Sequence, residues 1–344
     1  MAAMAFTPAL LALLALGGDP APEPDPDYPG LPGKMTGGCP STFMGTLCVE
    51  DVDQLQAQFA VIGVPWDAGT SARPGARFGP KAVRARWPWG QQGAAALDGY
   101  YDFDTGRTLL QGVTVVDVGD VLILPSDFQP NFDRITATIR KVRARGAVPI
   151  VIGGDHSITY PVLRGFDGLG GKLHVVHFDA HLDFSDGTKE TRLSHAHAMR
   201  RASELPFVSG ITNIGVRGLG SAEDLAEGRK RKVFDAVPAV QAMTMGMKKA
   251  VAAVPKAERY YVTIDVDVLD PSVAPGTGTP VPGGLSYLQL REALRELAAR
   301  GGVVGFDVVE YAPAYDHSEL TATVVESLIA GFAGDLALAA GRRP

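Results

Sequence analysis

Cysteine, excess positive charge and long apolar runs are all scarce in this chain. Its 344 residues include two cysteines, Cys39 and Cys48, too few for a disulfide framework. We expect both to be reduced thiols in a reducing compartment, and hence a cytoplasmic protein. The 32 Lys and Arg are outnumbered by 38 Asp and Glu, giving a formal net charge of −6. Nucleic-acid-binding proteins normally present a basic face, so this charge balance argues against that class of partner.

The N-terminal segment carries one apolar run, AFTPALLALLAL (5–16). It is too short to span a bilayer, and no Lys or Arg precedes it as in a signal peptide, although secretion stays open as an alternative. The proline-rich stretch GGDPAPEPDPDYPGLPG that follows indicates an extended arm. We interpret residues 1–35 as a tail or a subunit-contacting arm and 36–344 as a single folded domain, with no membrane association.

Short apolar runs rich in β-branched residues alternate with longer amphipathic segments along the rest of the chain. The near-continuous hydrophobicity of the short runs predicts strands covered on both faces, as in a parallel sheet. The predicted strands are 59–64, 113–120, 148–154, 173–180, 211–217, 260–268 and 303–310. Helices are expected at 131–146 and 286–302, the second capped by Ser286. This alternation predicts an α/β fold, a three-layer α/β/α sandwich with a mainly parallel sheet.

Polar side chains gather at the carboxyl ends of four predicted strands, where sites form in sheets of this kind. The polar segments are GGDHS (153–157), HFDAHLDF (177–184), DVD (265–267) and the single residue Glu310. In extended geometry Asp179, His181 and Asp183 point to the same side, as do Asp265 and Asp267. We therefore expect these side chains to converge in one cleft.

The charge of that cleft indicates which kind of ligand it binds. Converging carboxylates repel one another in a poorly solvated cleft unless they are protonated or paired with cations, and these motifs contain no Lys or Arg. Two divalent metal ions would neutralise four carboxylates, with histidines completing a nitrogen–oxygen ligand set that suits Mn, Co, Ni, Fe or Zn. A metal pair bridged by carboxylates can hold a hydroxide ready to attack an electrophilic carbon. The candidate ligands are His156, Asp179, His181, Asp183, Asp265 and Asp267.

Each motif taken alone has a simpler explanation. An Asp-x-Asp at a strand end is usually a turn or a helix cap, and a His after Gly-Gly is a weak signal. The three motifs together, in this order and at strand ends, disfavour the simpler explanation. His174 and His177 lie inside a predicted strand, which fits core packing or hydrogen bonding better than ligation. The role of His317 stays open.

At this point the motifs resemble those of the ureohydrolases, the arginase and agmatinase family. The matching segments, between about residues 55 and 340, are GVPWDAGTSARPGARFGPKAVR, GGDHS, HFDAHLD, SHAHAMRR, TIDVDVLDPSVAPGTGTPVPGGLS and DVVEYAPAYDHSELTA. The resemblance implies an arginase-like α/β/α fold and a dinuclear metal site. It also implies hydrolysis of a guanidino group to urea and an amine, by a homotrimer or homohexamer.

The resemblance further implies a role for individual residues. One metal would be held by His156, Asp179, Asp183 and Asp265, and the other by Asp179, His181, Asp265 and Asp267. Two Mn²⁺ ions are expected, with Ni²⁺ as the alternative. Asp183 would also orient the hydroxide and accept its proton. His195 would carry a proton to the leaving amine, and Glu310 would pair with the substrate guanidinium.

The substrate is less well determined. The segment FSDGTKETRLS, between Asp183 and His195, lacks the Asn-and-Ser pattern by which arginases hold an α-amino acid. RPGARFGP and YAPAYDHSELTA resemble the agmatinase branch, so we expect conversion of agmatine to putrescine and urea. The alternatives are 4-guanidinobutyrate, 3-guanidinopropionate, free guanidine, a biguanide and arginine. His197 departs from the usual agmatinase-like pattern and is a candidate substrate contact.

Two other classes of protein compete with this interpretation. Metal-dependent deacetylases on a related scaffold hold one zinc with fewer ligands, so the presence of His156, Asp183 and Asp267 disfavours them. A non-catalytic subunit that partners an active paralogue is the second alternative. Such a subunit has no chemical need for this concentration of charge.

Overall fold

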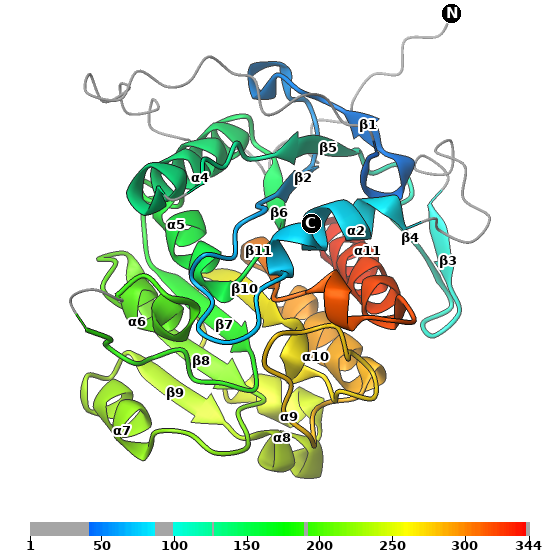
Figure 1. Cartoon of the computed structure of the whole chain (residues 1–344). Coiled ribbons are helices and arrows are strands. Elements are labelled where there is room, and N and C mark those ends of the chain that lie inside the picture. The colour runs from blue at the N-terminus through cyan, green and yellow to red at the C-terminus, as the bar shows by residue number, and fades with distance from the viewer. Residues whose placement is uncertain (1–40, 87–98, 126, 189–191, 342–344) are drawn as a thin grey trace, which may run out of the picture.

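The computed structural model describes residues 41–86, 99–125, 127–188 and 192–341, so the predicted tail at 1–35 lies outside the described residues. Nine strands form one sheet in the order β1-β5-β2-β6-β11-β10-β7-β8-β9, and its pairings are parallel (Figure 1). The strands are β1 (Leu47–Cys48), β2 (Phe59–Gly63), β5 (Val115–Asp120), β6 (Val148–Ile152), β7 (Leu173–Phe178), β8 (Val208–Ile214), β9 (Phe234–Val237), β10 (Arg259–Asp265) and β11 (Val303–Val309). Each strand predicted from the sequence is present, and β1 and β9 are additional.

The strand order brings the polar motifs together. The last strand, β11, lies in the middle of the sheet, between β6 and β10, and β7 pairs with the other edge of β10. Phe306 of β11 stands opposite Ile150 of β6 and Val262 of β10. The carboxyl ends of four adjacent strands, which precede the polar motifs, therefore meet at one edge of the sheet.

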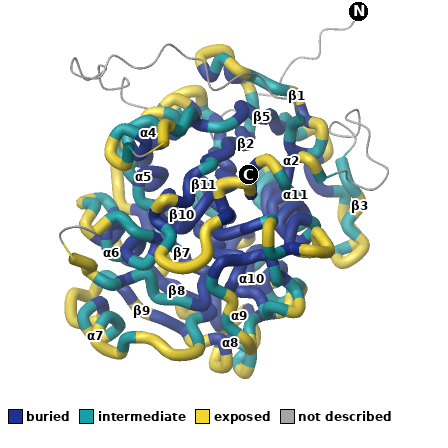
Figure 2. The backbone as a smooth tube through the Cα atoms, in the orientation of Figure 1, coloured by how far each residue is buried: buried dark blue, intermediate teal, exposed yellow. Residues whose placement is uncertain are grey.

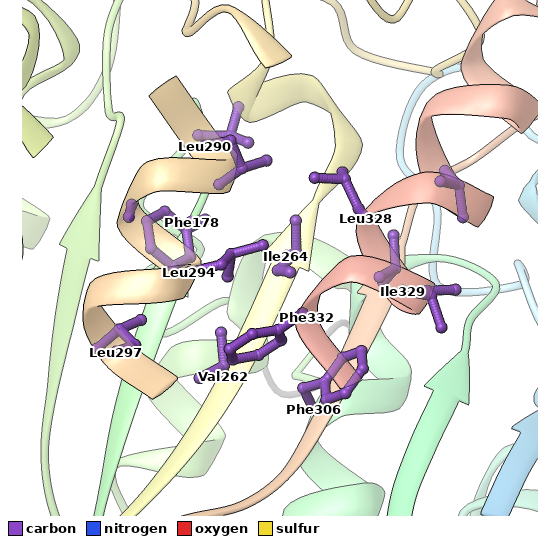
Figure 3. Close-up of a cluster of buried hydrophobic side chains, with 14 of the residues drawn as sticks. Phe178, Val262, Ile264, Leu290, Leu294, Leu297, Phe306, Leu328, Ile329 and Phe332 are labelled. Carbon is purple, nitrogen blue, oxygen red and sulfur yellow. The ribbon is translucent and has the colours of Figure 1, made fainter. Parts of the chain in front are cut away.

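Helices cover both faces of the sheet (Figure 1). On one face, α4, α5 and α6 pack on the strands through Ile135, Val162 and Met199. On the other face, α9, α10 and α11 form the second core, whose central side chains are drawn in Figure 3. The helices are α2 (Gly79–Ala85), α4 (Phe128–Ala144), α5 (Thr159–Arg164), α6 (Ala198–Ala202), α7 (Ala222–Lys230), α8 (Ala239–Met245), α9 (Met247–Ala252), α10 (Tyr287–Arg300) and α11 (Leu320–Gly341). The predicted α/β/α sandwich is confirmed.

Buried residues follow the strands, and exposed residues lie on the outer turns of the helices and on the loops (Figure 2). The two predicted helices correspond to α4 and α10. Helix α10 begins with a capping box: the Ser286 side chain accepts from the Gln289 N–H, and the Gln289 side chain accepts from the Ser286 N–H. It ends at Gly301, whose φ of 73° suits a residue without a Cβ.

Helix α11 was not predicted from the sequence. Its 22 residues, with a mean hydropathy of 1.5 in the most apolar window, are long and apolar enough to cross a membrane by length and composition alone. In the fold 61% of that window is buried. Gly331 leaves room for Arg291 of α10, whose Nη1 donates to Asp335 Oδ2 at 2.9 Å. These contacts are those of the core helix of a globular domain.

Two smaller features complete the fold. Strands β3 (Tyr100–Asp102) and β4 (Arg107–Leu109) form a separate antiparallel hairpin. Cys48 takes part in a disulfide bond, and Cys39, the other cysteine of the sequence, lies outside the described residues. The expectation of two reduced thiols is therefore wrong for Cys48, because a low cysteine count excludes a framework of disulfides but not a single one.

Candidate metal centre

The carboxyl edge of the four central strands collects the candidate ligands. His156 opens a 3₁₀ turn just after β6, and Glu310 follows β11 directly. Asp265 is the last residue of β10, and Asp267 lies in the next turn, Val266–Val268. The remaining ligands, Asp179, His181 and Asp183, follow β7.

A local turn places the ligands that follow β7 and β10. Asp179 Oδ1 accepts the N–H of His181 at 2.5 Å, and Asp265 Oδ1 accepts the N–H of Asp267 at 2.8 Å. An Asp side chain that bonds the main chain two residues on ends a strand and turns the chain. These turns replace the continued extended backbone expected from the sequence, since β7 ends at Phe178. They still bring alternate side chains to the same cluster.

The imidazole of His156 shows how well the cluster fits a metal ion. Its Nδ1 lies 3.0, 3.1 and 3.3 Å from carboxylate oxygens of Asp179, Asp183 and Asp265. This buried atom nevertheless has no hydrogen-bond partner in the part of the chain that the structure describes. The other nitrogen, Nε2, bonds Thr263 Oγ1 at 2.9 Å. In a metal-ligating histidine one ring nitrogen is fixed by a hydrogen bond and the other is free to bind the ion. Nε2 and Nδ1 of His156 have this arrangement.

Two overlapping groups of side chains could each hold one ion. One contains His156, His177, Asp179 and Asp183, and the other contains Asp179, His181 and Asp267, with the ligand atoms in each group within 4.8 Å of one another. His181 Nδ1 lies 3.0 Å from Asp267 Oδ2 and 3.4 Å from Asp179 Oδ1. Asp179 belongs to both groups, which is the position of a bridging carboxylate. Oxygen and imidazole donors without thiolate suit Mn²⁺ and its neighbours in the first transition row.

His177 is close enough to the candidate ligands to bind a metal ion, but its hydrogen bonds indicate that it orients Asp179 instead. Asn213 Oδ1 accepts the N–H of Val216, so its Nδ2 donates, reaching His177 Nδ1 at 3.1 Å. His177 therefore carries its proton on Nε2, which donates to Asp179 Oδ2 at 2.7 Å. A histidine that donates in this way orients a carboxylate ligand.

Without metal ions the cluster is electrostatically strained. Burial, followed by the charges of Asp267 and Asp179, raises the pKa of Asp265 well above its usual value. Burial and the charge of Asp179 likewise raise the pKa of Asp267. Burial lowers the pKa of His181, but hydrogen bonds to Asp179 and Asp267 outweigh it and raise the pKa to about 12. These carboxylates therefore favour a positive charge beside them, which metal ions bound by the same residues would supply.

A second cluster, of Ser71, His195 and Glu310, lies beside the ligands. Glu310 Oε1 accepts the main-chain N–H of His156 at 2.8 Å and faces His195 Nδ1 at 2.9 Å. His195 Nε2 accepts the main-chain N–H of Ser71 at 3.1 Å, and the Ser71 hydroxyl lies 2.8 Å from the same nitrogen. In the neutral imidazole these bonds place the proton on Nδ1, which donates to Glu310, and the second proton of the cationic form would be carried by Nε2. Burial opposes protonation of His195, but the Glu310 hydrogen bond and charge raise its pKa to about 9.

Asp183 and Glu310 both have left-handed backbones, with φ of 47° and 65°. Such a conformation is uncommon for a residue with a side chain. Asp183 is held by its carbonyl oxygen, which accepts the N–H groups of Met199 and Arg200 at the start of α6. Glu310 is held by its N–H, which donates to the Gly154 carbonyl at 2.8 Å. Main-chain hydrogen bonds to neighbouring motifs therefore hold the backbones of Asp183 and Glu310 in this conformation.

A cavity of about 560 Å³ opens onto the cluster. The candidate site residues in its wall are His181, Asp183, His195 and Asp265. His197 is buried but does not line the cavity; a Cβ on Gly187 would come within 2.7 Å of its Nε2. His317 is exposed and also lies outside the wall. The structure thus groups the six candidate ligands with His195 and Glu310, and sets His197 and His317 apart.

Comparisons with known proteins agree with this geometry. The model of the arginase family matches residues 57–334. The chain is 37% identical to the mitochondrial agmatinase of Gallus gallus over 279 residues, 78% of each protein. It is 33% identical to the mitochondrial guanidino acid hydrolase of Homo sapiens over 314 residues, 90% of this chain and 86% of that protein. The proclavaminate amidino hydrolase of Streptomyces clavuligerus superposes with a TM-score of 0.73 and 31% identity, covering 87% of this chain and 97% of that one.

The chain belongs to the arginase family. It is a metal-dependent C–N hydrolase, a ureohydrolase acting on a guanidino compound. This membership excludes the one-zinc deacetylase class as the source of the site. A non-catalytic subunit is disfavoured as well, because the candidate ligands and the His195–Glu310 pair lie together.

Sequence reasoning missed two contributors to this arginase-family site, Ser71 and Thr263, and did not connect a third, His177, with the metal centre. Ser71 is 124 residues from His195, and Thr263 is 107 residues from His156, so only the fold brings each pair together. His177 was interpreted as a core or hydrogen-bonded residue, and its bond to Asp179 links it to the centre. The TSARPG segment containing Ser71 was part of the family resemblance, which was the one available signal for that residue.

Proposed function

We propose that this arginase-family enzyme hydrolyses agmatine to putrescine and urea. The observation that carries the proposal is the charge of the cavity. Its charged lining consists of Asp183, Asp224, Asp265 and Arg217, besides the histidines. Bound metal ions would neutralise Asp183 and Asp265, so Asp224 is the carboxylate of this lining that remains for a substrate. Arg217 directs its N–H groups at main-chain carbonyls and has no donor left for a substrate carboxylate. A substrate that is cationic at both ends suits such a cavity better than a guanidino acid.

The contacts described above support the metal-binding residues that we propose. His156, Asp179, Asp183 and Asp265 would hold one divalent ion, and Asp179, His181, Asp265 and Asp267 the other. We propose Mn²⁺, with Ni²⁺ as the alternative. When bound, the two ions lower the pKa of water and supply Lewis acidity at the substrate carbon. The remaining steps depend on the side chains of this chain.

Three side chains bind the guanidinium and handle protons. Glu310 uses Oε1 for its bonds to His156 and His195, which leaves Oε2 for a charge-assisted bond to the substrate guanidinium. Asp183, 10% exposed at its side chain and 3.1 Å from His156 Nδ1, is placed to accept the proton of the attacking water. His195 would deliver a proton from Nε2 to the leaving amine.

Ser71 connects that histidine with the cavity. Its hydroxyl lies 2.8 Å from His195 Nε2, and Ser71 is itself part of the cavity wall. A hydroxyl can accept one proton while it donates another. Ser71 therefore offers a route between Nε2 and the leaving group without movement of the imidazole.

A guanidino acid is the second candidate substrate, because the chain is also similar to a guanidino acid hydrolase. Free guanidine, a biguanide and arginine are further alternatives of the same chemistry. The decisive experiment measures urea release from agmatine, 4-guanidinobutyrate, 3-guanidinopropionate, guanidine, a biguanide and arginine. Metal-free protein would be reconstituted separately with Mn²⁺ and Ni²⁺. We expect the highest kcat/KM with agmatine; a higher value for either guanidino acid would contradict the proposal.

Assembly and location remain predictions. We propose a homotrimer or homohexamer, which light scattering of the metal-loaded protein would test; a paralogous second subunit would be indicated if the purified chain bound two ions without activity. The cytoplasmic location stays a prediction, and the cysteines no longer support it because Cys48 is disulfide-bonded.

A further inference from the structure

The cavity extends outward from the metal centre to the segment after β8. Its outer wall contains the loop from Arg217 to Ser221 and the first turns of α7, including Asp224 and Leu225. Its inner wall contains Asp183 and Asp265. The cavity therefore joins two acidic regions that are separated along the chain.

The wall between these regions is apolar. It contains Leu182, Phe184, Val216 and Pro238, and Leu219 and Leu225 add apolar side chains to the outer wall. Glu310, bonded to His195 of the inner wall, is the proposed partner of the guanidinium. Together with the apolar wall and the acidic outer end, it matches a molecule with cations at both ends of a methylene chain.

Arg217 does not offer a free hydrogen-bond donor at that end. Its guanidinium donates to the carbonyl oxygens of Gly215, Asp267, Val268, Leu269, Val281 and Pro282. A guanidinium has five N–H donors, and here they are directed at the main chain beneath the cavity. Arg217 thus fixes the loops around the metal centre and has no donor left for a substrate carboxylate.

Asp224 is the acidic side chain of the outer wall. It is half-buried in the first turn of α7, where its N–H donates to the helix cap Ser221 at 3.0 Å. Its carboxylate makes no hydrogen bond or ion pair with any residue in the described ranges. The neighbouring Glu223 accepts from the Ser221 hydroxyl at 3.3 Å, is exposed, and lies outside the cavity wall. The two acids share a helix end, but only Asp224 faces the cavity.

We propose that Asp224 determines substrate specificity by accepting a charge-assisted hydrogen bond from a primary ammonium at the far end of the guanidino substrate. The same carboxylate repels substrates that end in a carboxylate. This inference rests on the proposed hydrolysis of agmatine and names the residue that selects it. Asp224 touches only the substrate tail, so its effect falls on binding of the tail rather than on the guanidinium chemistry.

The test varies the charge of the substrate tail while its length stays constant. Agmatine, n-pentylguanidine (in which a methyl replaces the ammonium) and 4-guanidinobutyrate are compared in the Mn²⁺-loaded wild type, Asp224→Asn and Glu223→Gln. Loss of a charge-assisted bond predicts about a tenfold fall in kcat/KM for agmatine with Asp224→Asn, mostly through KM. The value for n-pentylguanidine should change less than about twofold, because its tail carries no charge. Glu223→Gln, with the same charge change on the same helix, should leave all three values unchanged.

The outcomes distinguish failure of this inference from failure of the proposed function. If the wild type prefers agmatine and Asp224→Asn keeps the full preference over n-pentylguanidine, Asp224 is not the tail receptor, although the proposed function stands. Equal losses for both substrates would also overturn the inference, since they indicate a structural effect. A wild-type preference for 4-guanidinobutyrate would overturn both proposals. Asp224→Lys provides a second variant, which should raise kcat/KM for 4-guanidinobutyrate while metal content and melting temperature stay at wild-type values.

Discussion

Two clusters of buried carboxylates in this molecule balance their charge in opposite ways. In the Arg84 cluster, which joins α2 to β5, the guanidinium of Arg84 donates to both oxygens of Asp117 at 2.7 and 2.9 Å. It also bonds Asp120, and Arg84 and Asp117 are 7% and 0% exposed. At the metal centre, Asp179, Asp265 and Asp267 are equally buried, but within the described residues their ion-pair partners are histidines.

The difference distinguishes a structural cluster from a binding cluster. A buried carboxylate is tolerated when a cation neutralises it and hydrogen bonds satisfy its oxygens. In the Arg84 cluster the chain supplies that cation itself, and the main-chain N–H groups of Phe43 and Gly119 complete the set around Asp117. At the metal centre the cation must come from solution. Substitutions in the two clusters should consequently affect different measurements.

The largest effect is expected from Asp267→Asn at the metal centre. An amide cannot supply the negative charge of a ligand, so we expect loss of one ion and about a thousandfold fall in kcat, with the fold retained. Metal analysis, urea release and circular dichroism measure the three quantities. Asp235→Asn, at an exposed acid paired with Arg229, is the matched control. Full metal content and wild-type turnover in Asp267→Asn would refute the ligand assignment.

Arg84→Met should act on stability instead. It leaves Asp117 buried without its cation, which costs about 3–5 kcal/mol of unfolding free energy. Urea denaturation of the metal-loaded protein measures this loss, and Arg86→Met is the control. The Arg86–Glu319 pair has side chains 23% and 70% exposed, so its loss should cost less than about 1 kcal/mol. Equal losses of unfolding free energy in the two variants would show that the buried Arg84 cluster stabilises the fold no more than a surface ion pair does.

Glu310→Gln probes the edge of the metal centre. The amide keeps an oxygen to accept the His156 N–H but has no charge for a guanidinium, so kcat/KM should fall about a hundredfold. Metal content should remain at two ions, in contrast with Asp267→Asn. Steady-state kinetics with the best substrate gives the result, with Glu319→Gln as the control. Wild-type kinetics would show that the guanidinium is bound elsewhere.

The smallest effect concerns Glu326 of α11, a buried acid whose Oε1 has no hydrogen-bond partner among the described residues and on which only the charge of Arg86 acts to favour ionisation. Burial raises its pKa to about 7. Since the folded-state pKa lies above the unfolded-state value of about 4.3, stability is lost as the pH rises between these values. Glu326→Gln removes this loss and should stabilise the protein by about 1–2 kcal/mol at pH 8, with little change at pH 4. Urea denaturation at both pH values, with exposed Glu292→Gln as control, measures it; an equal shift at both would contradict the assignment.

The sequence predicts the sheet and the candidate ligands well because both depend on local patterns. Apolar runs of five to seven residues define β2, β6, β7, β10 and β11, and the polar residues that follow identify the strand ends. Helix α11 escaped prediction because it is apolar around most of its circumference. A helix buried on nearly all sides lacks the amphipathic period by which helices are recognised.

Contacts between distant segments could not be predicted in this way. The bond between Ser71 and His195, and the half-buried position of Asp224 in the cavity wall, depend on how loops after different strands meet. The exclusion of His197 from the cavity wall has the same origin: of the two histidines in the 3₁₀ turn His195–His197, His195 lines the cavity. Residue types indicate chemistry, and loop packing selects which of them take part.

The central position of β11 has a consequence for biosynthesis. Strands β1, β5, β2 and β6 lie on one side of β11, and β10, β7, β8 and β9 on the other. A chain emerging from the ribosome can assemble each group of strands in turn, but it cannot join them until residues 303–309 are available. His156 belongs to the first group and Asp179, Asp265 and Asp267 to the second. The ligands proposed for the first ion, His156 with Asp179, Asp183 and Asp265, therefore meet only when translation is almost complete, whereas those of the second ion all come from one group of strands.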